Sequence, residues 1–156
     1  MTLLGGLAWL AGQPFVFPSL GPSAFILAHQ RTGPATRPRR VVGSHVIGVG
    51  AGLLATVFLA DGVTLTTLPP PGSLAGLSLA ASAGLSMLGT VAGMLATDTV
   101  HAPACATTLI VSLGLLATPF EAGLIVVSVV LLVGAHRAGL VLMGERAAGG
   151  ERTSGP

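Results

Sequence analysis

The sequence predicts an all-α integral membrane protein with about four full transmembrane helices and two broken helices. The first reason is composition: of 156 residues, 51% are hydrophobic and 8% are charged, whereas a soluble domain carries about 25% charged residues. The mean hydropathy of +0.87 agrees with this. The second reason is that the 23 glycines and 11 prolines are scattered through apolar runs, which is common in packed transmembrane helices.

Full spans are expected at residues 41–60, 74–97 and 124–143, because each range supplies about the 20 apolar residues that cross a bilayer. An earlier apolar run, residues 3–11, is too short to span. We interpret it as the tail of a fourth helix whose start is missing from this chain. Glycines line the spans at spacings that let helices approach closely, which suggests a homo-oligomer.

Two similar short segments interrupt the apolar pattern, at residues 19–27 (SLGPSAFIL) and residues 100–108 (VHAPACATT). Each contains a proline, Pro22 in the first and Pro103 in the second, followed by two small residues and an apolar run. Each also follows an apolar run and precedes a full span. We therefore predict that the chain repeats one unit made of a span, a broken segment and a span.

The two units are repeat A, at about residues 1–60, and repeat B, at about residues 74–143, within one transmembrane domain over residues 1–143. The remaining residues, 144–156, are polar and glycine-rich and should form a flexible tail. A half-helix of about ten residues rises about 15 Å, half of the hydrocarbon core, and four or five extended residues cover about the other half. Each unit can therefore cross three times, which inverts the second relative to the first.

The arginines predict the orientation in the membrane. Four of the seven basic residues, all of which are arginine, lie in the loop at residues 31–40, so the positive-inside rule places this loop in the cytoplasm. If the second broken segment crosses, the last helix returns Arg137 and the tail to the same side. We predict a multi-pass protein of the cell membrane whose 31–40 loop and C-terminal tail are cytoplasmic.

The broken segments predict a binding site for a small anion. Both prolines suit the first helical position, where a missing N–H costs nothing, so two half-helices would begin near the middle of the membrane. Helix starts offer free N–H groups and partial positive charge, which can hold an anion without a buried Lys or Arg. No Lys or Arg lies within residues 41–97 or 100–134. The expected contacts of the anion are Ser19, Gly21, Ser23, His101, Ala102, Ala104 and Cys105.

His101 is the expected proton carrier. It lies three residues after Asp98 in an otherwise apolar region, and ionisable residues within membrane segments are costly and by default functional. Histidine changes charge near neutral pH, so we expect His101, with Asp98 or His45, to take up and release a proton. The alternatives are structural: the prolines would be kinks held by neighbouring helices, His45 would bond a backbone carbonyl, and Cys105 would be a small apolar filler.

Several other functional classes find no support in the sequence. A single cysteine excludes an intramolecular disulfide and a cysteine-based metal site within one chain. The four histidines and five acidic residues show no recognised ligand spacing. No phosphate-binding loop and no aromatic–basic pattern typical of nucleic-acid binding is found. We therefore expect no metal, cofactor or nucleic acid, and no enzymatic activity. The expected partners are a small inorganic anion and the lipid bilayer.

Three motifs resemble those of the HPP family of small membrane proteins, named for His-Pro-Pro. Residues 97–108 (TDTVHAPACATT) resemble the family's usual run TGTxHPPAGATA, residues 19–24 (SLGPSA) resemble SFGASA, and residues 37–45 (RPRRVVGSH) resemble QPRNVxGGH. The motifs occur in the family's order and cover most of the chain. The departures that matter most are these: Ala102 replaces a proline, Asp98 and Cys105 replace glycines, and Arg40 replaces an asparagine. Family members normally have a complete first helix, which agrees with a shortened one here.

What the resemblance implies is transport, because a plant chloroplast branch of the family is associated with nitrite movement. Our leading hypothesis is membrane transport of a small monovalent anion, nitrite-like and proton-linked through His101. These departures imply that its substrate need not be the family's. The main alternative is a non-transporting membrane scaffold or sensor subunit, which would have dry, tightly packed half-helices. A membrane enzyme that uses Cys105 or His101 is a third hypothesis. The sequence shows no pattern of side chains that would activate either residue for catalysis.

Overall fold

The computed structural model describes residues 1–13, 15–60 and 62–144. Within these residues the chain forms six α-helices, one short 3₁₀ turn and no strand, which confirms the all-α class. The predicted tail, with Arg146 and Arg152, lies outside the described residues apart from Gly144. The elements are α1 (Thr2–Ala11), α2 (Leu20–Gln30), η1 (Pro34–Thr36), α3 (Pro38–Leu59), α4 (Leu74–Ala96), α5 (Ala104–Ser112) and α6 (Pro119–Leu142).

Three of the described helices, rather than about four, are long and apolar enough to cross a membrane. These are α3, α4 and α6, with 22, 23 and 24 residues. The fourth expected helix corresponds to α1, whose 10 residues rise about 15 Å, too little to cross alone. It ends at Gly12, which adopts the left-handed conformation (φ 59°) that commonly terminates helices. The chain is therefore a multi-pass membrane protein with three candidate spans.

Two of the spans begin earlier than the apolar pattern predicts, and capping chemistry is the reason. Helix α3 begins at Pro38 instead of residue 41, because proline suits the first helical position after the extended Arg37. Helix α6 begins at Pro119 instead of residue 124. Thr118 and Glu121 form a capping box there: the Thr118 Oγ1 accepts from the Glu121 N–H at 3.2 Å, and a Glu121 carboxylate oxygen accepts from the Thr118 N–H at 3.1 Å.

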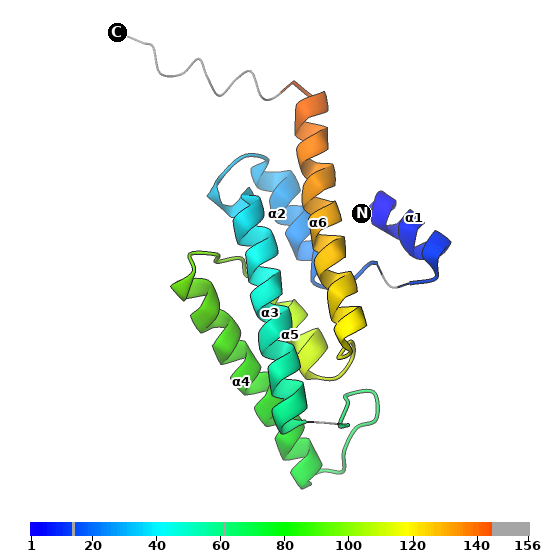
Figure 1. Cartoon of the computed structure of the whole chain (residues 1–156), viewed down its shortest axis with the longest axis vertical. Helices are drawn as coiled ribbons and strands as arrows, with labels where there is room; N and C mark the ends of the chain where they lie inside the picture. Colours follow the sequence, from blue (N-terminus) through cyan, green and yellow to red (C-terminus); the bar gives the residue numbers. More distant parts are fainter. Residues whose placement is uncertain (14, 61, 145–156) are drawn as a thin grey trace.

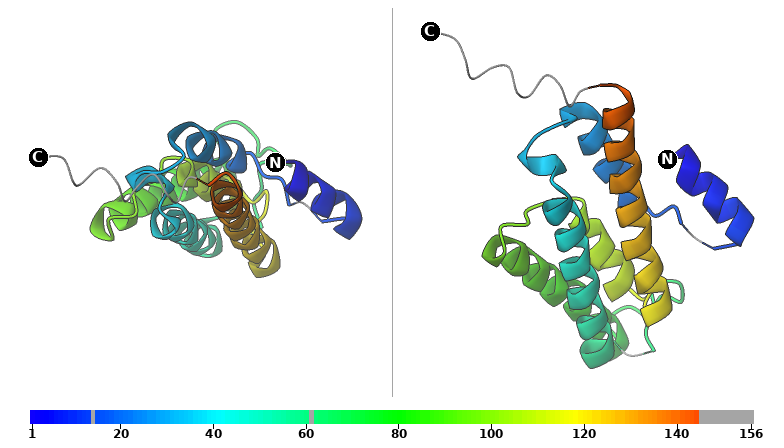
Figure 2. Two further views of the ribbon diagram at one scale, coloured as in Figure 1. Left: turned by 90° about the horizontal axis from the view of Figure 1, so that it is seen from above. Right: turned by 45° about the horizontal axis from the view of Figure 1, so that its top comes forward.

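Helix α3 is the centre of the bundle and packs against α4, α5 and α6 (Figure 1). Glycines on α3 permit the close approach of α5: a Cβ atom added at Gly48 would lie 2.8 Å from the Oγ1 of Thr108 and 2.9 Å from the carbonyl oxygen of Ala104. Helix α2 packs on α6, whereas α1 touches α6 and otherwise extends away from the bundle (Figure 2). These contacts place α5 against α3 and α2 against α6.

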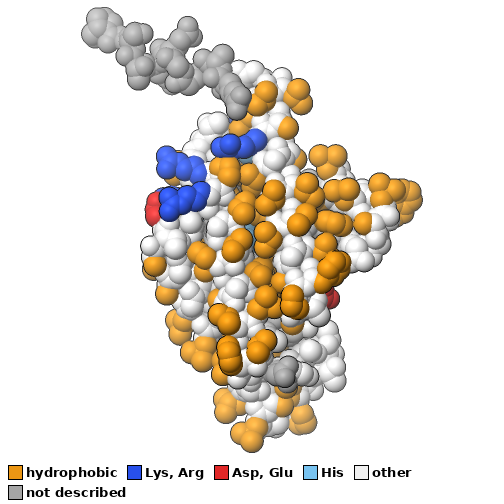
Figure 3. Space-filling view, viewed as in Figure 1, with side chains coloured by type: hydrophobic (Ala, Val, Ile, Leu, Met, Phe, Trp, Pro, Cys, Tyr) orange, Lys and Arg blue, Asp and Glu red, His pale blue; other side chains and the backbone are white. Residues whose placement is uncertain are grey.

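The arginines of the described residues gather at one end of the bundle, and apolar side chains cover much of the face seen in Figure 3. Helix α3 begins at this end and α4 returns to it. Helix α6 also ends there, because the Nε2 of His136 donates to the carbonyl oxygen of Arg31 at 2.8 Å. This is the arrangement expected if the second broken segment crosses the membrane. We refer to this part of the molecule as the basic end; its residues are Arg31, Arg37, Arg39, Arg40 and Arg137.

Candidate functional site

The two short helices begin inside the bundle and leave it in opposite directions (Figure 1). Helix α2, with 11 residues, ends just before Arg31 at the basic end. Helix α5, with 9 residues, ends at the opposite side, where the N–H of Leu65 in the α3–α4 loop donates to the carbonyl oxygen of Leu113 at 2.9 Å. Their starts meet, since Ser23 of α2 contacts His101 just ahead of α5. The two short helices therefore begin next to each other.

The prolines do not occupy the predicted first helical position in either half-helix. Pro22 is the third residue of α2, and Pro103 is the residue that precedes α5. At the start of α5, the N–H groups of Ala104, Cys105 and Ala106 already donate to carbonyl groups three residues earlier, at 3.0–3.1 Å. Tight turns of this kind satisfy the donors that a free helix start would offer. The prediction that this end offers free N–H groups is wrong for these three.

The start of α2 keeps an unused polar group. Ser19 stands at the N-cap, where a serine oxygen normally accepts from the N–H of the second or third helical residue. The third residue is Pro22, which has no N–H. The Oγ of Ser19 is fully buried and makes no hydrogen bond with the described residues. An unpartnered buried hydroxyl is uncommon and is a natural contact for a ligand or water.

Ser23 joins two buried histidines from different parts of the chain. Its Oγ lies 3.2 Å from the Nε2 of His45 on α3 and 3.0 Å from the Nε2 of His101. The two imidazole rings are 5.7 Å apart between centroids. On its other side, the Nδ1 of His45 lies 2.7 Å from the Oγ1 of Thr107 on α5. We call Ser23, His45, His101 and Thr107 the histidine cluster. His101 is 3% exposed, and the other three side chains are fully buried.

The hydrogen bonds assign the protons within the histidine cluster. A serine hydroxyl has one proton to donate and can accept two. Ser23 donates to the carbonyl oxygen of Ser19 at 3.1 Å, so it accepts from the Nε2–H of both histidines, and Thr107 donates to the Nδ1 of His45. With Nε2 as a donor and Nδ1 as an acceptor, His45 is then neutral. No hydrogen bond from the described residues reaches the Nδ1 of His101. That nitrogen can therefore take a proton without breaking an existing bond.

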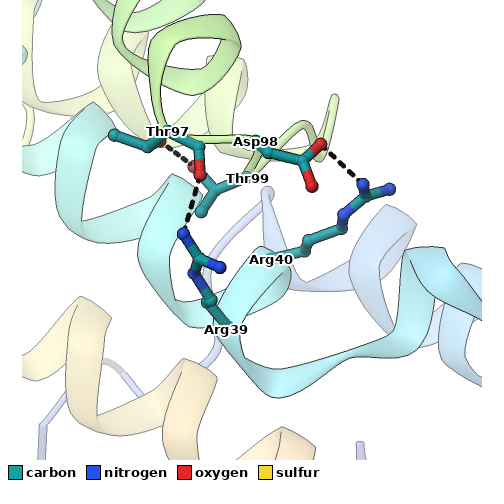
Figure 4. Close-up of polar contacts among 5 residues, drawn as sticks. All are labelled: Arg39, Arg40, Thr97, Asp98 and Thr99. Carbon is teal, nitrogen blue, oxygen red and sulfur yellow. Dashed lines mark hydrogen bonds and ion pairs between the residues drawn. The ribbon is translucent and has the colours of Figure 1, made fainter.

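Asp98 does not join His101, although only two residues separate them in sequence. It lies exposed in the loop after α4, where its carboxylate accepts from the guanidinium of Arg40 at 2.6 Å (Figure 4). The hydrogen bond and charge of Arg40 hold the pKa of Asp98 below its usual value. Arg39 donates to the carbonyl oxygen of Thr97 at 3.1 Å in the same loop. The structure thus brings His45, and not Asp98, to His101.

The backbone of Asp98 predicts how its substitution acts. Its φ of 51° lies in the left-handed region, which glycine adopts freely and β-branched residues do not. We expect Asp98→Gly to keep or raise the melting temperature of the purified protein, and Asp98→Val to lower it. Both variants lose the carboxylate that pairs with Arg40, so their difference isolates the backbone effect. Equal melting temperatures for the two variants would contradict this explanation.

The other predicted contacts lie around the histidine cluster. Gly21 and Ala102 line an open groove of about 640 Å³ between α2 and α5, together with both prolines, Phe25, Ile26 and Ala106, and its lining is almost entirely apolar. Ala104 is fully buried against α3. Cys105 is a free, partly buried cysteine. No hydrogen bond among the described residues links its thiol to the histidine cluster. The structure therefore brings together Ser19, Ser23, His45 and His101.

Sequence reasoning missed the threonines of α5. Thr107 bonds His45, and the Oγ1 of Thr108 lies 2.8 Å from the Oγ1 of Thr90 on α4. The sequence feature that could have revealed them is a pair of adjacent hydroxyl residues one turn inside an apolar half-helix.

Among the described residues, no three His, Cys, Asp or Glu side chains gather where they could hold a metal ion.

Comparison with known proteins identifies one related family. The family model described as "HPP, transmembrane region" matches residues 1–144, almost the whole chain. No curated protein and no solved structure matches the sequence.

Proposed function

Since the chain belongs to the HPP transmembrane family, we propose that it transports a small monovalent anion such as nitrite across the membrane. One observation carries the proposal: His45 and His101 share the hydroxyl of Ser23 between the meeting starts of α2 and α5. The buried, unpartnered Oγ of Ser19 lies one turn away on α2. The α2 start also contributes the positive end of its helix dipole, which favours an anion.

The absence of an acid from the histidine cluster supports coupling to protons. A proton on the Nδ1 of His101 would create a buried positive charge, and an uncompensated buried charge costs several kcal/mol. Asp98 cannot balance it, because it is paired with Arg40 at the surface. The transported anion would supply the missing negative charge. We therefore propose that the proton and the anion bind together and move as a neutral pair.

Most helix contacts are consistent with the proposed inverted repeat; the exception is the contact of α4 with α5, which has no comparable counterpart between α1 and α2. An inverted repeat would match α1 with α4, α2 with α5 and α3 with α6. The contact between α3 and α5 then corresponds to the contact between α6 and α2. The same matching turns the contact of α3 with α4 into that of α6 with α1, and it maps the α3–α6 contact onto itself. The opposite directions of α2 and α5 support inversion as well. Under this proposal, repeat A covers about residues 1–60 and repeat B about residues 74–143.

One observation favours the alternative of a non-transporting scaffold or sensor subunit. The histidine cluster is closely packed, and the groove beside it has an apolar lining. In a scaffold, a buried polar network of this kind would serve to fix one arrangement of the helices. The alternative predicts that no small anion is carried.

Uptake by proteoliposomes tests the transport proposal directly. We expect the purified full chain to give saturable uptake of nitrite, and of nitrate or formate to a different extent. Uptake should rise when the pH outside is lowered relative to the inside, because a proton enters with each anion. Empty liposomes are the control. The absence of saturable uptake for all three anions would overturn the proposal and favour the scaffold.

A further inference from the structure

A small pocket lies at the basic end, away from the histidine cluster, between the loop before α3 and the end of α6. Its volume is about 160 Å³, and its lining includes Arg31, Arg37, His136 and Arg137. Liquid water occupies about 30 Å³ per molecule, so the pocket has room for a phosphate-sized group. None of the described residues that line it is acidic.

The walls of this pocket are held in place by hydrogen bonds. The Nε2 of His136 donates to the carbonyl oxygen of Arg31 at 2.8 Å and ties α6 to the loop. Within the loop, the N–H of Gly33 donates to the Oγ1 of Thr36 at 3.1 Å, and that hydroxyl donates to the carbonyl oxygen of Gly33 at 3.0 Å. Thr36 is itself buried. The positive side chains therefore project from a fixed frame.

The electrostatics of the pocket favour an anion. Arg37 immediately precedes α3, whose first turn carries the partial positive charge of a helix start. Arg137 comes from the other side of the pocket, near the end of α6. Guanidinium groups present planar forks of N–H donors that match phosphate oxygens. Among the described residues, Asp98 is the acid at this end; it pairs with Arg40 and is not in the lining.

The position of the pocket points to a lipid as the source of the phosphate. Helix α3 is a candidate membrane span, so its first residues lie at the level of the lipid headgroups. Leu140, on the candidate membrane span α6, gives the pocket one apolar wall. We propose that this pocket binds the phosphate of an anionic phospholipid headgroup, with Arg37 and Arg137 as its main contacts. The proposal does not depend on transport.

Lipid binding by purified variants tests the proposal. Phosphatidylglycerol, added to the full chain in neutral detergent, should raise its melting temperature more than phosphatidylcholine does. The double variant Arg37→Gln/Arg137→Gln should bind phosphatidylglycerol at least about tenfold more weakly, since both arginines attract the anionic headgroup. Arg39→Gln/Arg40→Gln removes the same charge at the same end without touching the pocket, and should keep the lipid-dependent increase.

Two results would overturn the proposal. Equal loss of phosphatidylglycerol binding in both double variants would mean that total charge, and not the pocket, attracts the lipid. An equal rise in melting temperature with inorganic phosphate alone would assign the pocket to free phosphate.

Discussion

Replacing Ser23 with alanine is expected to lower the initial rate of nitrite uptake by at least about tenfold. The Oγ of Ser23 accepts from His45 at 3.2 Å and from His101 at 3.0 Å. Without it, two buried N–H donors lose their partner, and each buried unsatisfied donor costs about 1–3 kcal/mol. A change of about 1.4 kcal/mol in a barrier is a tenfold change in rate. Uptake by proteoliposomes of equal protein content measures the effect.

Two further variants separate function from packing in this experiment. Ser82 is also fully buried and donates to a carbonyl group, that of Ser112 at 3.0 Å, but lies outside the histidine cluster. Ser82→Ala should therefore keep most of the uptake. His101→Gln retains an amide donor for Ser23 but cannot carry a proton, so uptake should lose its stimulation by external acid. Equal losses for Ser23→Ala and Ser82→Ala would show that the cluster acts through packing alone.

Long apolar runs sufficed to predict the three spans, because a 20-residue hydrophobic stretch has few other stable environments. The helix starts were less well predicted, since they depend on single side chains. Thr118 and Glu121 stand three residues apart in the capping-box pattern, which would have placed the start of α6 correctly. The fourth span was expected because the apolar run at residues 3–11 was interpreted as the tail of a longer helix, whereas α1 has 10 residues in this chain.

The candidate site was predicted in part, and the errors have a common physical cause. Ser23 and His101 were grouped through the repeat, and the structure joins them. Asp98 was grouped with His101 because the two are close in sequence, but its left-handed backbone is part of a turn that leaves its side chain at the surface. The bond from His45 to Thr107 spans 62 positions. No local pattern reveals a contact between residues so far apart.

Two departures from the family pattern explain each other in the structure. Asp98 stands where the family usually has glycine, which agrees with a φ of 51° at that position. Aspartate tolerates this conformation better than most residues. Arg40 stands where the family usually has asparagine, and its guanidinium is the partner of the Asp98 carboxylate (Figure 4). Arg40 thus supplies the partner of the Asp98 carboxylate, and neither residue belongs to the histidine cluster.

Replacing Gly48 with alanine is expected to lower the free energy of unfolding by about 1–3 kcal/mol, the usual cost of overfilling a packed interior. The new Cβ would lie 2.8 Å from the Oγ1 of Thr108 and 2.9 Å from the carbonyl oxygen of Ala104. A backbone carbonyl cannot turn aside as a flexible side chain can, so α5 would have to move away from α3. Thermal unfolding of the purified protein measures the loss.

The same displacement should also lower anion uptake. Gly48 lies one turn beyond His45 on α3, and the neighbouring turn of α5 carries Thr107. Moving α5 outwards would stretch the 2.7 Å contact between these two side chains. Gly50→Ala is the matched control on the same helix, because a Cβ at Gly50 meets nothing within 4 Å. If both alanine variants unfolded at the wild-type temperature, the close approach of α3 and α5 at Gly48 would not limit stability, and the link from packing to the histidine cluster would fail.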